Sequence, residues 1–308
     1  MRVVLWGPSE HVTDEERAAL AERLGRRGAA VSERARDERP PPETEVVVCN
    51  TKTRLDAAAL EALPALRLVV TTTSGHDHVD LAAAAARGVA VARCPIARRD
   101  AVVQTSIAMA LALLHRLPRY SADAAAGRWA RAAARERAPT LLSSLRVGVV
   151  GHGVIGARAV GAWSALGADV VATDPADPAL PTFEAIRADV DVVTLHCSLT
   201  KSSDRLIDAA AVRSMREGAI LVNTARGECV DLEAALSGRL GGVGLDVFPV
   251  EPPPDLAALA ARDDVILTPH SAGVHAGLGA ALLDEAEAAI GAFLDGRPVP
   301  HLVPAPPG

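Results

Sequence analysis

The sequence is poor in aromatic residues and cysteine, and each shortage excludes a class of protein. Aromatic side chains make up 2% of the 308 residues, too few for the stacking platforms that hold single-stranded nucleic acid. The four cysteines (Cys49, Cys94, Cys197 and Cys229) stand far apart without a C-x-x-C pair, so we expect free thiols rather than a disulfide framework. The net charge of −6 argues against a general nucleic-acid binder.

Long hydrophobic runs are absent as well. The longest purely apolar stretch is Ile107–Leu114, whereas a bilayer span needs about 20 residues. The opening residues, MRVVLWGPSE, lack a secretory h-region. We therefore expect a cytoplasmic protein that binds neither membrane nor nucleic acid. Hydrophobic residues at 49% and charged residues at 23% are typical of a globular protein, and the chain length predicts two domains.

Strand-like and helix-like segments alternate over the first ninety residues. The predicted strands are Val3–Trp6, Glu45–Cys49, Arg67–Thr71 and Val89–Ala92, and the predicted helices are Thr13–Leu24, Asp56–Ala62 and Asp80–Arg87. Thr13 and Asp80 stand where helix N-caps belong, and Gly25 and Gly88 where helices stop. This alternation predicts a parallel sheet with crossover helices.

A second α/β series begins near residue 146. An apolar helix over 101–117, ended by Pro118, precedes it. The predicted strands are Arg146–Val150, Asp169–Thr173, Val190–Leu195, Ala219–Asn223, Gly242–Val247 and Val265–Thr268, and Ala276–Leu294 is predicted to be a final helix. Six strands with intervening helices make a second doubly wound unit. The predicted fold class is therefore α/β, with two doubly wound parallel-sheet domains.

A glycine-rich loop, G-x-G-x-x-G, directly follows the strand Arg146–Val150 and opens a helix. Gly151 permits a tight turn, Gly153 lets the backbone approach a pyrophosphate, and Gly156 lets the helix pack on the strand. Asp174 ends the next strand, at the position of a carboxylate that binds ribose hydroxyls. No arginine stands in Ala172–Pro178 to accept a 2′-phosphate, so the loop predicts NAD rather than NADP.

Four more motifs accompany the glycine loop: TSGHDHVD at Thr73–Asp80, NTARG at Asn223–Gly227, GLDVFPVEP at Gly244–Pro252 and LTPH at Leu267–His270. Together they resemble the D-isomer specific 2-hydroxyacid dehydrogenase family over roughly residues 45–275. The resemblance implies a Rossmann domain that binds NAD, inserted in a smaller flavodoxin-like substrate domain. We expect residues 99–271 to form the former, and residues 1–98 with 272–308 to form the latter.

The resemblance also implies three catalytic residues. Arg226 of the NTARG motif would bind the substrate, because a guanidinium fork suits the adjacent oxygens of a 2-oxo acid. His270 and Glu251 would form the acid–base pair, in which the imidazole supplies a proton to the developing alkoxide. The carboxylate beside it would favour the charged imidazole. The implied activity is the interconversion of a 2-oxo acid and a D-2-hydroxy acid with NAD.

Further contacts are carried over from the family by position. The cofactor-binding set is Gly151, Gly153, Val154, Ile155, Gly156, Asp174, His196, Cys197, Ser198, Thr224, Ala225, Asp246, His270 and Gly273, with Asp246 expected at the nicotinamide carboxamide. Backbone amides of Ser74, Gly75 and His76 would bind the substrate carboxylate beside Arg226. A homodimer is a further family expectation.

Three alternatives remain open from the sequence. The histidines and aspartates of residues 76–80 could suggest a metal site, but Asp80 caps a helix, so we expect no metal. Arg98 or Arg99, expected in a loop after Cys94, could recognise a second acidic group on the substrate. An NAD(H)-sensing scaffold or corepressor of the same fold is the alternative function. The sequence does not identify the 2-hydroxy acid or the extent of NADP use.

Overall fold

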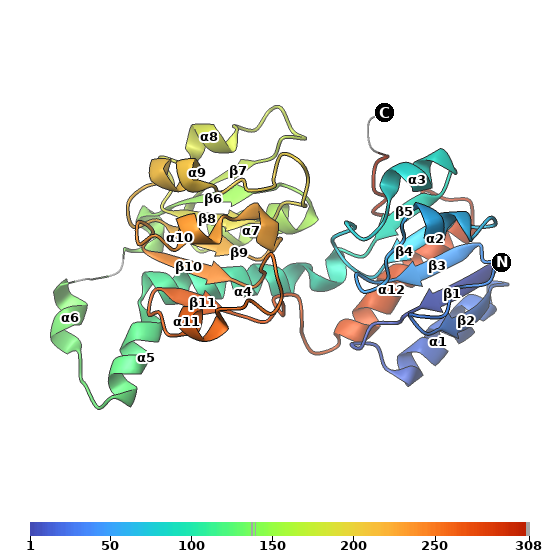
Figure 1. Ribbon diagram of the computed structural model, residues 1–308, viewed down its shortest axis with the longest axis horizontal. Helices are drawn as coiled ribbons and strands as arrows, with labels where there is room; N and C mark the ends of the chain where they lie inside the picture. Colours follow the sequence, from blue (N-terminus) through green and yellow to red (C-terminus); the bar gives the residue numbers. More distant parts are fainter. Residues whose placement is uncertain (137, 139, 306–308) are drawn as a thin grey trace. The chain divides into compact units, whose positions relative to one another are not determined.

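The structure, a computed structural model, describes residues 1–136, 138 and 140–305. The chain forms two compact units, Met1–Arg98 together with His275–Gly308, and Arg99–Val274 (Figure 1). The chain returns to the first unit at 274/275, three residues beyond the expected 271/272. Each unit has its own parallel sheet, which confirms the predicted fold class of two doubly wound α/β domains.

The first unit is a five-stranded sheet in the order β2-β1-β3-β4-β5, the flavodoxin-like order. Its strands are β1 (Arg2–Trp6), β2 (Ala30–Arg34), β3 (Val46–Cys49), β4 (Leu68–Thr71) and β5 (Ala90–Arg93), and its helices are α1 (Asp14–Gly25), α2 (Ala57–Glu61), α3 (Leu81–Ala86) and α12 (Leu278–Leu294). Thr13 caps α1 with a full capping box, and the Asp80 side chain caps α3. Both predicted N-caps are confirmed.

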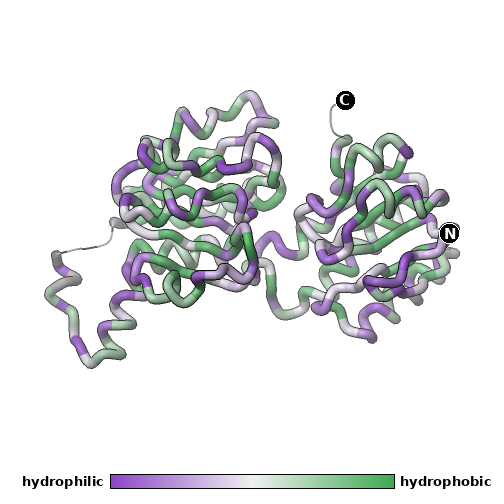
Figure 2. Tube along the Cα trace, in the orientation of Figure 1, coloured by the Kyte–Doolittle hydropathy of each residue, from purple (hydrophilic) through white to green (hydrophobic). Residues whose placement is uncertain are grey.

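Side chains of this sheet alternate between two apolar clusters, as a doubly wound sheet requires. Val3 and Leu5 of β1 pack with α12, whereas Val4 and Trp6 pack with the cluster that includes Leu60 of α2. Apart from β2, the strands of both units appear as mainly hydrophobic tube in Figure 2. Strand β2 was not predicted from the sequence, because as an edge strand it pairs with β1 alone and has no buried residue.

The second unit is a six-stranded parallel sheet in the order β11-β10-β9-β8-β6-β7. Its strands are β6 (Arg146–Val150), β7 (Asp169–Thr173), β8 (Val192–Leu195), β9 (Ile220–Asn223), β10 (Gly242–Leu245) and β11 (Val265–Leu267). Its helices are α5 (Leu117–Ala125), α6 (Arg131–Glu136), α7 (Val154–Ala165), α8 (Phe183–Ile186), α9 (Ala209–Ser214), α10 (Leu232–Ala235) and α11 (Leu256–Ala260), with 3-10 turns at Leu142–Ser144 and Gly227–Cys229. All six predicted strands are present.

Helix α4 (Ile96–Leu114) starts five residues earlier than predicted and ends before Pro118. Arg116 has a φ of 54° and separates α4 from α5, and Pro118 lies in the first turn of α5, where a missing amide proton costs nothing. Arg98 and Arg99 therefore lie in a helix rather than in the expected loop. Within the described residues, no single helix has both the length and the apolar character for a membrane span, although the bent pair α4–α5 passes that test jointly.

Candidate functional site

The carboxyl edge of the second sheet carries most of the predicted site residues. Strand β6 lies between β7 and β8, so the connections leaving β6 and β8 diverge at this point (Figure 1). Ligands of open α/β sheets bind at such a switch point, beyond the carboxyl ends of the strands. The glycine loop leaves β6 here, and His196, Cys197 and Ser198 leave β8.

The glycine loop has a geometry that only glycine permits at two of its three positions. Gly151 has a φ of 93°, and a Cβ there would lie 2.7 Å from the backbone of Cys197. A Cβ on Gly156 would lie 1.8 Å from the carbonyl oxygen of Gly151. Nothing lies within 4 Å of a Cβ built on Gly153, the N-cap of α7. The loop thus leaves room for a phosphate at a helix N-terminus, and Val154 and Ile155 form the first turn.

Asp174 follows β7 and faces this loop. Its Oδ2 accepts a hydrogen bond of 2.7 Å from the backbone N–H of His152, and its Oδ1 accepts one of 2.9 Å from Ala176. The carboxylate is therefore fixed beside the glycine loop by two backbone amides. A ribose diol suits this acceptor, and a 2′-phosphate would be repelled by it.

His196 forms the floor beneath the loop. Its backbone N–H donates to the Val150 carbonyl at 2.7 Å, and its Nε2 lies 3.0 Å from Thr194 Oγ1. Burial lowers the pKa of His196 to about 4, so its imidazole is neutral at pH 7. Beside it, the contact with Cys229, followed by burial, raises the pKa of the Cys197 thiol. Both residues present uncharged side chains under a loop built to receive an anion.

The backbone of Arg226 is fixed by residues for which the sequence suggested no role. The buried Asn223 side chain accepts from the Ala225 N–H at 3.0 Å and donates to the Arg226 carbonyl at 2.8 Å. A Cβ on Gly227 would lie 1.9 Å from the carbonyl carbon of Phe248. A buried asparagine at a strand end, three residues before a motif arginine, is the signal that could have identified Asn223 as a positioning residue.

His270 and Glu251 lie together in the second unit. His270 Nδ1 is 2.9 Å from Glu251 Oε2, while Glu251 Oε1 accepts from the backbone N–H of Phe248 at 3.1 Å. The two side chains are 54% and 38% exposed, so the pair is open to a ligand. His270 has a φ of 52°, a strained conformation for a residue with a side chain, and such strain clusters at functional sites. With Nδ1 held by a carboxylate, Nε2 is the nitrogen able to exchange a proton with a substrate.

Asp246 holds the loop that carries His270. Its carboxylate is 2% exposed and accepts from Thr268 Oγ1 at 2.6 Å and from the Ser271 and Ala272 N–H groups at 2.8 and 3.0 Å. Its carbonyl accepts from the His270 N–H at 2.8 Å. The expected contact with a carboxamide stays a prediction, whereas the structure gives Asp246 a positioning role. In the sequence Asp246 lies within the GLDVFPVEP motif, which predicted a ligand contact and gave no sign of this positioning role.

Ser74, Gly75 and His76 belong to the first unit, in the loop after β4. Thr73 Oγ1 donates to the Gly75 carbonyl at 2.7 Å, and Arg93 Nη1 donates to the Ser74 carbonyl at 3.3 Å. These bonds fix the loop at the carboxyl edge of the first sheet. Among the described residues, no group of three or more His, Cys, Asp or Glu side chains is arranged to hold a metal ion.

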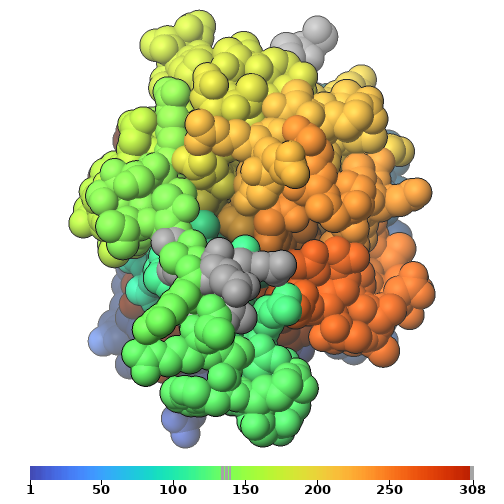
Figure 3. Space-filling view, turned by 90° about the vertical axis from the view of Figure 1, so that its left-hand side faces the viewer, coloured from blue at the N-terminus to red at the C-terminus, as the bar shows by residue number. Residues whose placement is uncertain are grey.

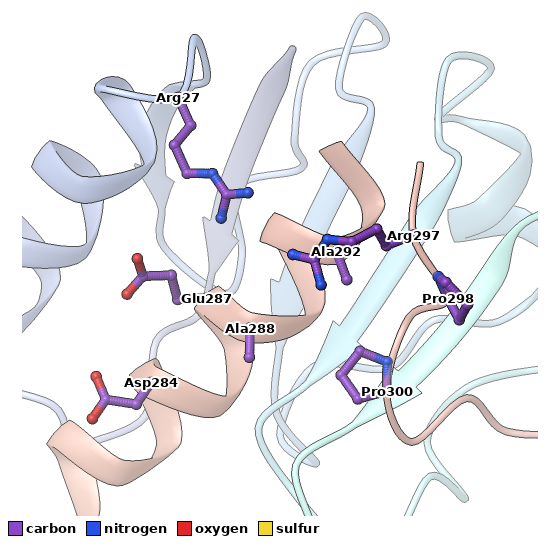
Figure 4. A pocket seen from close by; sticks show the side chains of 8 residues that line it. All are labelled: Arg27, Asp284, Glu287, Ala288, Ala292, Arg297, Pro298 and Pro300. Atoms are coloured by element: carbon purple, nitrogen blue, oxygen red, sulfur yellow. The ribbon is translucent and has the colours of Figure 1, made fainter. Parts of the chain in front are cut away.

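A surface hollow along α12 in the first unit is unrelated to these residues. Figure 4 shows Arg27 on one side of it and the charged groups of α12 on the other. The charges are paired within the unit, since Arg27 and Arg297 both contact Asp295, at 2.7 and 2.8 Å. We assign this hollow no catalytic role.

Comparison with known proteins identifies the family of this chain. The family model for the D-isomer specific 2-hydroxyacid dehydrogenase NAD-binding domain matches residues 107–272, more than half of the chain. The chain belongs to the D-isomer specific 2-hydroxyacid dehydrogenase family. NAD is accordingly its cofactor, and the geometry of the glycine loop fits that cofactor.

Relatives within this family carry different substrate names. Hydroxypyruvate reductase of Thermotoga maritima is 32% identical over 241 residues, which span 74% of this chain and 78% of that protein. D-3-phosphoglycerate dehydrogenase of Mycobacterium tuberculosis is 35% identical over 243 residues, which span 74% of this chain but 45% of that protein. The solved D-lactate dehydrogenase of Aquifex aeolicus with NAD and lactic acid covers 96% of each chain, with a TM-score of 0.80 and 25% identity.

Proposed function

We propose that this 2-hydroxyacid dehydrogenase interconverts a 2-oxo acid and a D-2-hydroxy acid, working as a 2-oxo acid reductase with NADH. The observation that carries the proposal is the 2.9 Å contact between His270 Nδ1 and Glu251 Oε2 at the carboxyl edge of an NAD-binding sheet. The cofactor supplies the hydride. The protein supplies orientation, charge and a proton.

Each of the three catalytic residues has a distinct proposed role. The Arg226 guanidinium binds the carboxylate and the 2-oxo oxygen, and it keeps the reacting carbon in place. Protonated His270 donates its Nε2 proton to that oxygen as the alkoxide develops, so the product leaves as a neutral hydroxyl group. Glu251 orients the imidazole through the contact with Nδ1. In the oxidative direction, His270 accepts the proton.

The remaining contacts are proposals for binding. We propose that the cofactor contacts the glycine loop through Gly151, Gly153, Val154, Ile155 and Gly156, the ribose side through Asp174, and the neighbouring loops through His196, Cys197, Ser198, Thr224, Ala225, Asp246, His270 and Gly273. Ser74, Gly75 and His76 of the first unit are proposed to bind the substrate carboxylate through their backbone amides.

Replacement of the proposed acid tests the function. His270→Ala should lower kcat with 2-oxo acids by about 10²- to 10⁴-fold, the usual contribution of a general acid, while NADH still binds. Arg226→Ala should raise KM and lower kcat together. His115→Ala, at an exposed histidine after α4, is the matched control and should change neither kcat nor NADH binding. Stopped-flow NADH oxidation and NADH fluorescence titration measure the two properties.

Wild-type turnover by His270→Ala would refute the acid–base role. A protein that binds NADH tightly but oxidises it with no 2-oxo acid would instead fit the scaffold or corepressor alternative.

We also propose a homodimer formed through the second unit. Three large apolar side chains there are strongly exposed, Leu117 at 54%, Trp129 at 88% and Leu141 at 72%. They lie on or beside the α5–α6 segment, the green projection in Figure 3. Large exposed apolar side chains favour association when a partner covers them, and sedimentation velocity would give the oligomeric state.

A further inference from the structure

Two guanidinium groups lie at the carboxyl edge of the first sheet without a carboxylate partner among the described residues. Arg93 is the last residue of β5, and its only side-chain hydrogen bond within that part of the chain goes to the Ser74 carbonyl, at 3.3 Å. Arg98 lies in the first turn of α4 and acts electrostatically on the Cys94 thiol. Cys94 in turn donates its N–H to the carbonyls of Thr71 and Thr73. Arg93 therefore contacts the proposed substrate loop directly, and Arg98 acts on Cys94, whose backbone is bonded to the start of that loop.

Arg98 and its neighbour Arg99 differ in a way that the sequence could not show. Arg99 contacts Asp100 at 3.1 Å, and Asp100 also contacts Arg158 at 2.8 Å. Arg98, in contrast, has no ion pair or hydrogen bond to any residue that the structure describes, and its Nε is buried. Burial lowers the pKa of Arg98, but a guanidinium remains charged at pH 7.

The Nε of Arg98 and the Nε of Arg93 are both buried without a hydrogen-bond partner among the described residues, and a buried guanidinium donor without a partner is costly unless an acceptor completes it. Glu285 acts electrostatically on Cys94, as Arg98 does, but its two oxygens accept from the N–H groups of Ile96 and Ala97 at 3.0 and 2.8 Å. Both oxygens of Glu285 are therefore occupied by the first backbone amides of α4. Arg98 therefore has no carboxylate partner among the described residues, and its guanidinium can bind an anionic ligand.

We propose that Arg98 binds a second anionic group on the substrate, with Arg93 adding positive potential at the same sheet edge. The substrate class is then a 2-oxo acid that carries a further carboxylate or a phosphate away from the reacting carbon. This inference rests on the proposed reductase function and adds its specificity. A guanidinium fork binds either anion through paired charge-assisted hydrogen bonds.

The experiment compares 2-oxo acids that differ only in the second anion. Oxaloacetate is paired with 2-oxobutyrate, 2-oxoglutarate with 2-oxovalerate, and 3-phosphohydroxypyruvate with hydroxypyruvate, each assayed by NADH oxidation. We expect kcat/KM to favour the dianion of at least one pair by about 10- to 100-fold, the range of a charge-assisted hydrogen bond. The pair that shows the preference identifies the anion as carboxylate or phosphate.

Variants assign the preference to its residue. Arg98→Met should abolish it by raising KM for the dianion, with little change for the monoanion, and Arg98→Lys should retain part of it. Arg99→Met is the matched control and should leave the preference intact. NADH binding and far-UV circular dichroism verify that each variant is folded.

Two results would overturn the inference. Equal kcat/KM within all three pairs, or an unchanged preference in folded Arg98→Met, would remove Arg98 from recognition while leaving the reductase function in place. NADH oxidation with none of the six acids would instead refute the reductase function, and this inference with it.

Discussion

At the scale of single residues, two histidines of the second unit, His270 and His196, lie in different environments. His270 and Glu251 are partly exposed and paired at 2.9 Å. His196, in contrast, has a buried Nδ1 and a pKa lowered to about 4 by burial. The same residue type thus has two roles, because one imidazole is left open to a ligand and the other is desolvated beneath the glycine loop.

The buried imidazole predicts a specific loss of stability in acid. The folded pKa of His196, about 4, lies below its ordinary value of 6.5, so between these values the unfolded chain binds more protons than the folded one. The free energy of unfolding should therefore fall as the pH drops from 6.5 toward 4, by up to about 1.4 kcal/mol per pH unit from this group.

Urea unfolding at pH 7 and pH 5 measures the effect. His196→Gln keeps a polar group near Thr194 but cannot be charged, so its free energy of unfolding should fall less between the two pH values. An equal fall in wild type and variant would show that His196 is not the group responsible.

At the scale of elements, helix α7 contains a glycine that packing requires and one that it does not. A Cβ on Gly156 would lie 1.8 Å from the Gly151 carbonyl oxygen, whereas nothing lies within 4 Å of a Cβ on the exposed Gly161. Gly156→Ala should therefore displace the loop, destabilise the fold by about 1–3 kcal/mol or more and weaken NADH binding.

Gly161→Ala is the matched change in the same helix. It should raise the free energy of unfolding by about 0.5–1 kcal/mol, because alanine loses less backbone entropy on folding, and NADH affinity should be unchanged. Urea melts and fluorescence titrations of the two variants test the contrast. Similar behaviour of both variants would mean that the close approach at Gly156 does not constrain the loop.

The element boundaries also show what sequence patterns can and cannot predict. The strands of the second unit were predictable because buried parallel strands read as continuous apolar runs. The start of α4 was not, because its first amides are capped by Glu285 from α12 rather than by a local residue. The edge strand β2 was missed because a strand paired on one side needs no apolar pattern.

The candidate site was predictable to a similar degree. The motifs predicted Arg226, Glu251 and His270 as site residues, and the structure brings Glu251 and His270 together. The Asn223 contacts lie within the NTARG motif, but the motif does not show that the Asn223 side chain is the group that holds the Arg226 backbone. The Asp246 contacts join residues 25 positions apart, which no short motif encodes. The difference between Arg98 and Arg99 likewise depends on side-chain packing, since the two are adjacent in sequence.

At the scale of the whole molecule, each unit has its own pair of apolar clusters. Trp6 is buried in a cluster of the first unit, and Trp163 is fully buried in a cluster of the second. The glycine loop and Asp174 belong to the second unit alone. A ligand that binds only the native second unit stabilises that unit by mass action, by about 2.7 kcal/mol at a concentration 100 times its Kd.

These two tryptophans can therefore report the unfolding of each unit separately. In a Trp129→Phe background, Trp6→Phe leaves Trp163 as the only tryptophan, and Trp163→Phe leaves Trp6. Saturating NAD⁺ should move the urea midpoint reported by Trp163 upward and leave that reported by Trp6 much less changed. Equal shifts for both probes would contradict independent unfolding and would mean that the two units unfold as one cooperative structure.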